Sequence, residues 1–122
     1  MPSKNSLLRD LSLLLLAFAL VALYVATSGG GFALDDAWIH QTFARNLAQY
    51  GEWSFIPGEP TAASTSPLYT LLLSVGYRLN LPYALWTHAL GALALGFAGM
   101  IGARMATQAL PQVRSAPLIT GL

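Results

Sequence analysis

The stretch "LSLLLLAFALVALYVAT" (Leu11–Thr27) is a continuous apolar run without a charged residue. As a helix its 17 residues cover roughly 25 Å, and flanking residues complete a membrane crossing of about 30 Å. Lys4 and Arg9 precede the run, which favours a cytoplasmic N-terminus. A cleavable signal peptide is the alternative, but the run is longer than the usual hydrophobic region and more apolar segments follow it. We therefore predict a membrane helix over about residues 10–28.

The composition points the same way. The 122 residues are 55% hydrophobic and only 9% charged, whereas a soluble domain is about 25% charged. The formal net charge of +1 gives no indication of a nucleic-acid partner. The absence of cysteine from the sequence excludes disulfides, thiolate catalysis and cysteine-ligated zinc.

The segment "DDAWIHQTFARNLAQYG" predicts an amphipathic helix over residues 35–50. Asp35 is the expected N-cap, Asp36 suits the positive end of the helix dipole, and Gly51 ends the helix. Such a helix lies in the membrane interface instead of crossing it. The expected apolar face is Ile39, Phe43, Leu47 and Tyr50, and the expected polar face is Gln41, Arg45 and Gln49.

Two further apolar segments predict membrane helices over about residues 66–80 and 82–104. Residues 28–66 then lie outside, an inner turn falls near Arg78, and the third crossing leaves Arg104 outside. The last residues, "SAPLITGL", turn apolar again and predict the start of another segment. The expected fold is an all-α membrane protein with about three transmembrane helices and an interfacial amphipathic helix in the first outer loop.

The adjacent carboxylates of Asp35 and Asp36 have two interpretations. One is structural, since an N-cap and a favourable charge near the helix dipole together stabilise a helix by roughly 1–2 kcal/mol. The other is catalytic, since a second carboxylate beside a low-dielectric boundary raises the pKa of one member of the pair, which suits a general base. The residues alone leave both open.

The remaining polar candidates also have alternative interpretations. His40 lies four residues after Asp36, so the two acids and His40 form a weak metal-site candidate; the alternative is a local Asp36–His40 contact or an imidazole that faces water. His88 lies within the third apolar segment, where it either marks a functional site or bonds a neighbouring helix. Arg45 either meets a phosphate or is solvated.

Four spaced elements carry a resemblance to a known family. They are "DDAWI" (35–39), "ARNLA" (44–48), "PGE" (57–59) and "TSPL" (65–68). In this order they resemble the start of membrane glycosyltransferases of the GT-C superfamily, most closely the bacterial polyprenyl-phosphate-sugar-dependent group that includes terminal arabinofuranosyltransferases and mannosyltransferase-like enzymes. Ile56 stands where the family often has Asn, and Trp38 where Tyr is frequent, but both acids are kept.

The resemblance covers about a third of the chain and implies a function. It implies that the chain is the N-terminal part of a longer multi-pass enzyme of the plasma (inner) membrane, with its acidic loop extracytoplasmic and most of the donor pocket outside this part. A polyprenyl-phosphate sugar would be the donor, and a hydroxyl of a glycan, protein or lipid the acceptor. No metal is required, a divalent ion being the alternative. Asp35, or as second choice Asp36, would be the catalytic base, and the expected substrate-binding residues are His40, Arg45, Glu59, Ser64 and Thr65.

A non-catalytic membrane scaffold or accessory subunit is the alternative from a different class. In that interpretation the acids only stabilise the helix, and the helix over residues 35–50 is a surface for a partner.

Overall fold

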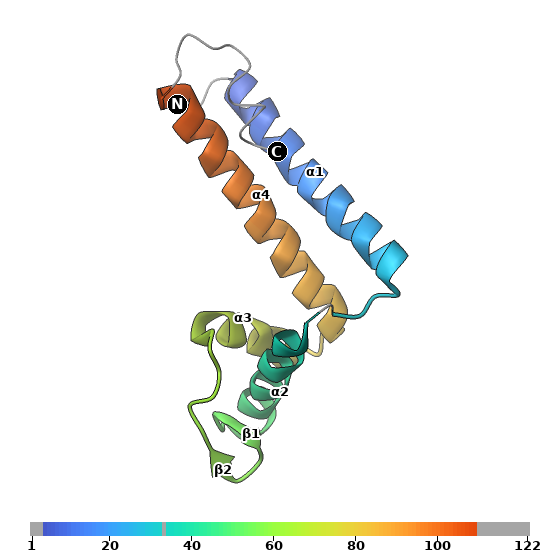
Figure 1. The fold of residues 1–122 in the computed structure, drawn as a ribbon, viewed down its shortest axis with the longest axis vertical. Coiled ribbons are helices and arrows are strands. Elements are labelled where there is room, and N and C mark those ends of the chain that lie inside the picture. Colours follow the sequence, from blue (N-terminus) through green and yellow to red (C-terminus); the bar gives the residue numbers. More distant parts are fainter. Residues whose placement is uncertain (1–3, 33, 110–122) are drawn as a thin grey trace. The chain divides into compact units, whose positions relative to one another are not determined.

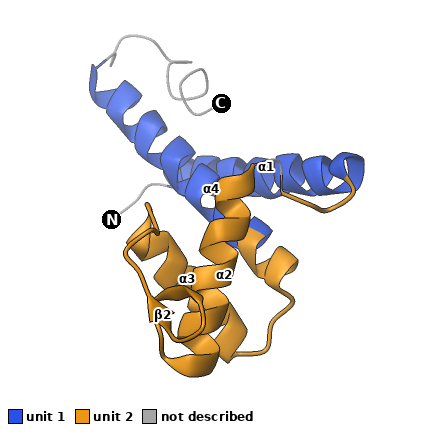
Figure 2. Ribbon diagram, turned by 60° about the horizontal axis from the view of Figure 1, so that its bottom comes forward, with its two compact units in different colours: residues 1–28, 88–122 blue, residues 29–87 orange. Residues whose placement is uncertain are grey.

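The computed structural model describes residues 4–32 and 34–109. The prediction of a mostly helical chain is confirmed, and the apolar segment predicted over residues 115–122 lies outside the described residues. The chain forms two compact units, which Figure 2 distinguishes: unit 1 comprises residues 1–28 and 88–122, and unit 2 comprises residues 29–87. The elements, labelled in Figure 1, are α1 (Lys4–Ser28), α2 (Asp35–Tyr50), β1 (Ser54–Ile56), β2 (Glu59–Pro60), α3 (Pro67–Arg78) and α4 (Tyr83–Ala109).

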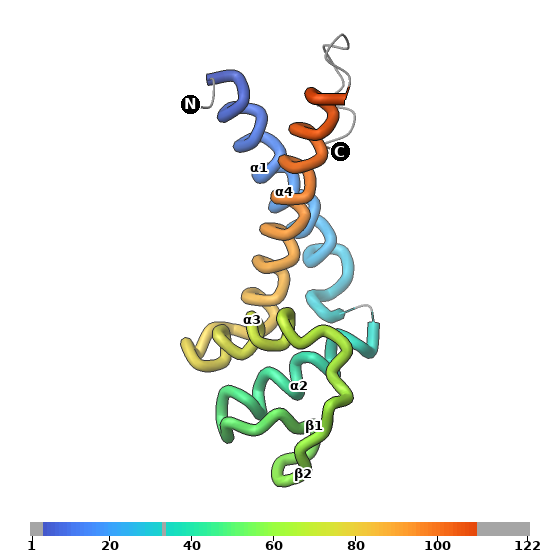
Figure 3. Tube along the Cα trace, turned by 90° about the vertical axis from the view of Figure 1, so that its left-hand side faces the viewer, coloured from blue at the N-terminus to red at the C-terminus, as the bar shows by residue number. Residues whose placement is uncertain are grey.

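In unit 1, helices α1 and α4 cross as an antiparallel pair, which can be followed in Figures 1 and 3. At one end, Arg104 Nη2 donates a hydrogen bond of 2.8 Å to Asp10 Oδ2. Towards the other end, the rings of Tyr24 and His88 meet edge to face with their centroids 6.0 Å apart. Because the first turns of α1 contact the last turns of α4, the two helices run antiparallel.

Small residues let the two helices approach closely. A Cβ added at Gly96 would lie 2.7 Å from Leu14 Cδ1 and 3.4 Å from Leu14 Cα. Small side chains at a helix interface allow this kind of close contact. The buried residues of α1 and α4 in unit 1 are otherwise Leu13, Ala17, Ala92, Ala103 and Ala106.

Among the described residues, two helices, α1 and α4, are long and apolar enough to cross a membrane. The crossing expected over residues 66–80 is not shown. Helix α3 has only 12 residues, about 18 Å at 1.5 Å per residue, whereas a span needs about 20 residues. Polar residues explain the difference, because Thr70 and Ser74 of α3 are buried within unit 2.

The contacts of Arg104 also differ from the expected topology. With three spans, Arg104 and Arg9 would lie on opposite sides of the membrane. Instead, both guanidinium groups bind the same carboxylate, with Arg9 Nη2 and Arg104 Nη2 each 2.8 Å from an oxygen of Asp10. The two arginines therefore lie at the same end of the α1–α4 pair, and the predicted separation is wrong.

In unit 2, α2 packs against α3 around the buried side chains of Phe43, Ala44 and Leu73. Helix α2 occupies the residues expected and ends at Gly51, whose left-handed backbone (φ 72°) directs its N–H to Leu47 O at 3.1 Å. The expected division of faces is wrong at Gln41, which is 4% exposed. Hydrophobic periodicity places Gln41 on the solvent-facing side of the helix. A local pattern cannot show that residues distant in the sequence supply its hydrogen-bonding partners.

A short antiparallel hairpin, β1–β2, replaces part of the expected loop. Its turn contains Gly58 with φ 86°, and Glu52 Oε2 accepts the Gly58 N–H at 2.7 Å. The side-chain amide of Asn46, in α2, donates to the carbonyl oxygens of Ser54 and Phe55, both at 3.0 Å. One buried side chain therefore attaches the hairpin to the helix.

The start of α4 belongs to unit 2 and packs on α3. Trp86 Nε1 donates to Leu72 O at 2.9 Å, and the indole covers Gly76 so closely that a Cβ there would lie 2.2 Å from Trp86 Cδ1. Only glycine allows this approach of the ring to the helix.

Candidate functional site

The two candidate catalytic acids occupy the first turn of α2, and both are exposed. The expected N-cap at Asp35 is wrong. Leu34 occupies that position with an extended backbone (φ −126°, ψ 144°), and no side chain caps the helix. Because Asp35 and Asp36 are themselves helical, their charges still lie at the positive end of the helix dipole. Neither side chain makes a hydrogen bond or ion pair within residues 4–32 and 34–109.

His40 lies in a buried cluster of hydroxyl groups instead of beside the acids. Its Nδ1 is 3.2 Å from Ser64 Oγ and 3.1 Å from Thr70 Oγ1, and these two hydroxyls are 2.9 Å apart. All three residues are at most 7% exposed. Both sequence interpretations of His40, a contact with Asp36 and an imidazole in water, are wrong, and the described residues contain no group of three that could hold a metal ion.

The His40 cluster fixes the chain that leads into α3. Ser64 belongs to the segment between β2 and α3, while Thr70 is in the first turns of α3. The imidazole therefore joins α2 to both, and the edge of the Tyr69 ring packs against it with centroids 5.7 Å apart. Burial raises the pKa of the Tyr69 phenol. Thr65, next to Ser64, is exposed, as is Glu59 in β2.

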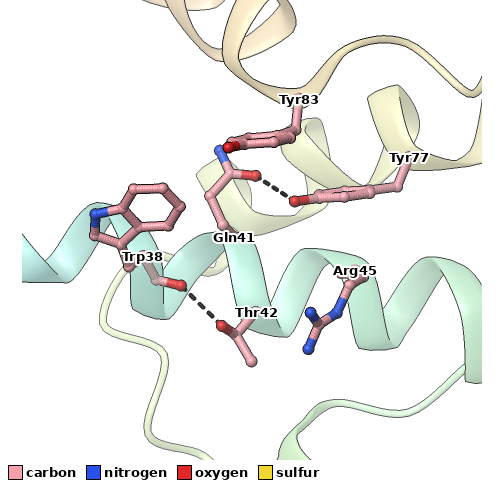
Figure 4. A pocket seen from close by; sticks show the side chains of 6 residues that line it. All are labelled: Trp38, Gln41, Thr42, Arg45, Tyr77 and Tyr83. Atoms are coloured by element: carbon pink, nitrogen blue, oxygen red, sulfur yellow. Dashed lines mark hydrogen bonds between the residues drawn. The ribbon is translucent and has the colours of Figure 1, made fainter. Parts of the chain in front are cut away.

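A cavity of about 320 Å³ lies beside α2, within unit 2. In Figure 4, Gln41 points from α2 towards two tyrosines, one from α3 and one from the first residue of α4, and the other lining side chains also belong to α2. Of the sequence candidates, only Arg45 lines this cavity. The full lining is Trp38, Gln41, Thr42, Arg45, Tyr77 and Tyr83.

A chain of hydrogen bonds holds the wall of this cavity. The Tyr77 hydroxyl donates to Gln41 Oε1 at 2.8 Å, and Gln41 Nε2 donates to Thr87 Oγ1 at 2.5 Å. Thr87 Oγ1 in turn donates to the Tyr83 carbonyl oxygen at 2.7 Å. Burial raises the pKa of the Tyr77 phenol, and the nearby positive charge of Arg45 opposes that rise in part.

Sequence reasoning missed most of these residues for a physical reason. Gln41 and Thr87 are 46 positions apart, and Gln41 and Tyr77 are 36 apart. A local pattern contains no information about such pairs. The one available signal was the spacing of Trp38, Thr42 and Arg45, which places them on one stripe of α2 with Asp35.

No known protein-family model matches the chain, and no curated protein or solved structure is significantly similar to it. The chemical assignment therefore depends on the residues themselves. They offer two exposed carboxylates that can accept a proton and, on the same helix, a cavity with one cation and aromatic walls.

Proposed function

We propose that this chain is part of a membrane glycosyltransferase that moves a sugar from a polyprenyl-phosphate donor to an acceptor hydroxyl. The observation that carries the proposal is the state of Asp35 and Asp36, two adjacent exposed carboxylates whose side chains cap nothing. An N-cap was their simplest structural use, and it is excluded. The resemblance of the surrounding segment to the GT-C superfamily supplies the reaction class.

The distance along the chain from α1 to the acids supports a reaction at a membrane surface. Helix α1 is long and apolar enough to cross a membrane, and it ends at Ser28. Seven residue steps separate Ser28 from Asp35, and at roughly 3.3–3.6 Å per step an extended chain reaches at most about 25 Å. If α1 spans the membrane, the acids stay within about 25 Å of its end, where the head group of a lipid-linked sugar is accessible.

The proposed chemistry needs one base. Asp35 accepts the proton of the acceptor hydroxyl as its oxygen attacks the anomeric carbon. The bond between that carbon and the phosphate oxygen breaks, and the lipid phosphate leaves with the bonding electrons, so the anomeric configuration inverts. Asp36 orients the acceptor, or exchanges roles with Asp35. A well-placed base contributes about 10²–10⁴-fold to the rate.

The other candidate residues divide into two roles. Arg45, Glu59 and Thr65 are exposed and remain candidates for substrate contacts. His40 and Ser64 are buried and bonded to each other, so we assign them a positioning role for the loop that leads into α3.

The charges of unit 1 support an orientation with the N-terminus in the cytoplasm. Lys4, Arg9 and Arg104 gather at one end of the α1–α4 pair, because Arg9 and Arg104 share Asp10. Positive residues near the ends of membrane helices favour the cytoplasmic side. The acids, which follow the other end of α1, then lie outside the plasma (inner) membrane.

The test is a transfer assay in membranes that contain the full reading frame encoding this chain. With polyprenyl-phosphate sugars as donors, Asp35→Asn should lower the rate by about 10²–10⁴-fold, and Asp36→Asn should lower it less. Gln49→Ala, at an exposed position of the same helix, is the matched control and should keep full activity. Undiminished transfer by the Asp35→Asn, Asp36→Asn double variant at normal expression would overturn the catalytic role of the two acids. No transfer above background by the unchanged protein would favour a non-catalytic scaffold.

A further inference from the structure

Beyond glycosyl transfer, we propose that the cavity lined by Trp38 and Arg45 is a binding site for a hydroxylated ring that bears an anionic group, a phosphate ester or a carboxylate. This inference rests on the proposed function in one respect, since Arg45 is a candidate substrate contact there, but it is tested by binding alone. It is argued from the cation, the aromatic wall and the hydrogen-bonding capacity of the cavity.

The cation is Arg45, which lines the cavity and makes no ion pair within residues 4–32 and 34–109. Its guanidinium group presents five N–H donors in a fixed plane, which matches the oxygens of a carboxylate or phosphate. The described arginines at the end of unit 1, Arg9 and Arg104, both bind Asp10. Arg45 therefore has an unused capacity for an anion at the edge of a cavity.

The aromatic wall is Trp38, held in place by two other rings. The Phe32 ring meets it edge to face with centroids 4.9 Å apart, and the Tyr83 ring lies 6.2 Å away. The Trp38 side chain is nevertheless 45% exposed. A ring that is oriented by its neighbours and still open offers a face for the C–H surface of a sugar-like ring at little cost in conformational entropy.

The other polar groups that line the cavity favour hydroxyl groups on the ligand. Thr42 donates its own proton to Trp38 O at 3.0 Å, and Tyr77 donates to Gln41. Both hydroxyl oxygens keep lone pairs, so they accept hydrogen bonds from a ligand. The cavity thus combines acceptors along its wall with donors at Arg45.

The size of the cavity limits the ligand. Its volume of about 320 Å³ lies at the lower end of the range of about 300–1,000 Å³ for small-molecule sites. One ring with a charged substituent is therefore the expected occupant. The same chemistry occurs in a soluble sugar phosphate or uronate and in the head group of an inositol phospholipid.

The experiment follows the Trp38 indole N–H resonance of the isotope-labelled chain in phosphatidylcholine nanodiscs. Glucose 6-phosphate and glucuronate are titrated against neutral glucose, and a second arm adds phosphatidylinositol to the nanodiscs. We expect an anionic ring to bind at least about tenfold more tightly than glucose, as a charge-assisted contact with Arg45 allows. Binding of the soluble probes assigns the source to a soluble glycan, and a response to phosphatidylinositol alone assigns it to a lipid head group; both support the site.

The variants separate the two halves of the site. Arg45→Gln should reduce the anionic preference to within about twofold of glucose, whereas Arg78→Gln, at an exposed arginine outside the cavity, should leave it intact. Trp38→Leu should weaken the binding of all the ring probes, and Trp38→Phe should restore that binding in part. Because both variants lack the Trp38 indole, binding is followed at the Thr42 amide resonance. An unchanged anionic preference in Arg45→Gln, or no response to any anionic probe, would overturn the inference. Because no turnover is measured, this result is independent of the transfer assay.

Discussion

Units 1 and 2 bury opposite kinds of side chain. In unit 1 the buried residues of the described helices are small or aliphatic, while large apolar side chains such as Leu15 (70% exposed) and Leu23 (61% exposed) point outward. In unit 2, Phe43 and Leu73 are accompanied by many buried polar groups. These polar residues are His40, Gln41, Asn46, Ser54, Ser64, Thr70, Ser74 and Thr87.

The difference teaches that the two units depend on different interactions. Hydrogen bonds within the unit satisfy most of the polar groups that unit 2 buries, since an unsatisfied buried group costs about 1–3 kcal/mol; among the described residues, Asn46 Oδ1 and Ser54 Oγ have no hydrogen-bond partner. Unit 1 has few such groups, and its outward leucines match a lipid environment, in which tight packing of small residues holds helices together. Changes to packing and to hydrogen bonds should therefore affect the two units unequally.

The largest effect is expected from Gly76→Ala in unit 2, compared with Gly96→Ala in unit 1. The new methyl group at residue 76 would lie 2.2 Å from the rigid Trp86 ring, but at residue 96 the shortest contact, 2.7 Å, is to the flexible end of Leu14. We expect Gly76→Ala to destabilise unit 2 by about 1–3 kcal/mol. Gly96→Ala should cost less than about 1 kcal/mol, since alanine also favours the helix by about that amount.

Hydrogen exchange measured by mass spectrometry checks this pair. Peptides from residues 67–78 should lose protection in Gly76→Ala, while peptides from residues 88–109 keep theirs. Equal losses in both units in both variants would show that the units do not differ in this way.

A smaller effect is expected when the His40 cluster loses one hydroxyl. Thr70→Val keeps the shape of the side chain but removes its bonds to His40 and Ser64, which are 3.1 and 2.9 Å long. Because His40 and Ser64 still bond each other, the loss should be about 1–2 kcal/mol. The measurement is the denaturant midpoint of unit 2, with Thr65→Val at the neighbouring exposed position as control. A Thr70→Val protein as stable as the control would mean that these bonds add nothing to unit 2.

The smallest effect is expected from pH. The folded Tyr77 phenol has a raised pKa, so the unfolded chain loses this proton first, at about pH 10. The contribution of Tyr77 to the stability of unit 2 is fully present below that pH, and it is lost as the pH rises through the higher pKa of the folded state. Tyr77→Phe should flatten the alkaline loss of unit 2 stability in part, since Tyr69 contributes in the same direction. An identical alkaline profile in the variant would exclude Tyr77 as a source.

The sequence predicted the elements better than their environment. Gly51 ended α2 as expected, because the signal for this helix end is local, and α2 begins at residue 35 as expected although Leu34, and not Asp35, is its N-cap. The length of α3 was overestimated, since an apolar run such as "LLL" (71–73) does not distinguish a short buried helix from a membrane span. The β1–β2 hairpin was not predicted, although Pro57-Gly58 supplies its turn.

The site was less predictable than the fold. Arg45 was a candidate because a lone cation on an amphipathic helix is conspicuous. The aromatic and amide residues around it, Gln41, Tyr77 and Tyr83, converge only after α2, α3 and the start of α4 have packed. His40 was assigned to the acids because the two are near in sequence, whereas its partners come from residues 24 and 30 positions away.

The two hydrogen bonds from Asn46 have a consequence for the hairpin tip. They hold the backbone of β1, while Phe55 and Ile56 remain 46% and 56% exposed. Ordering a free loop costs about 1–2 kcal/mol of backbone entropy per residue. Since the hairpin backbone is already ordered in the folded chain, Phe55 and Ile56 form a preorganised apolar projection. A partner surface that buries these two side chains would not have to offset the entropy of ordering the loop.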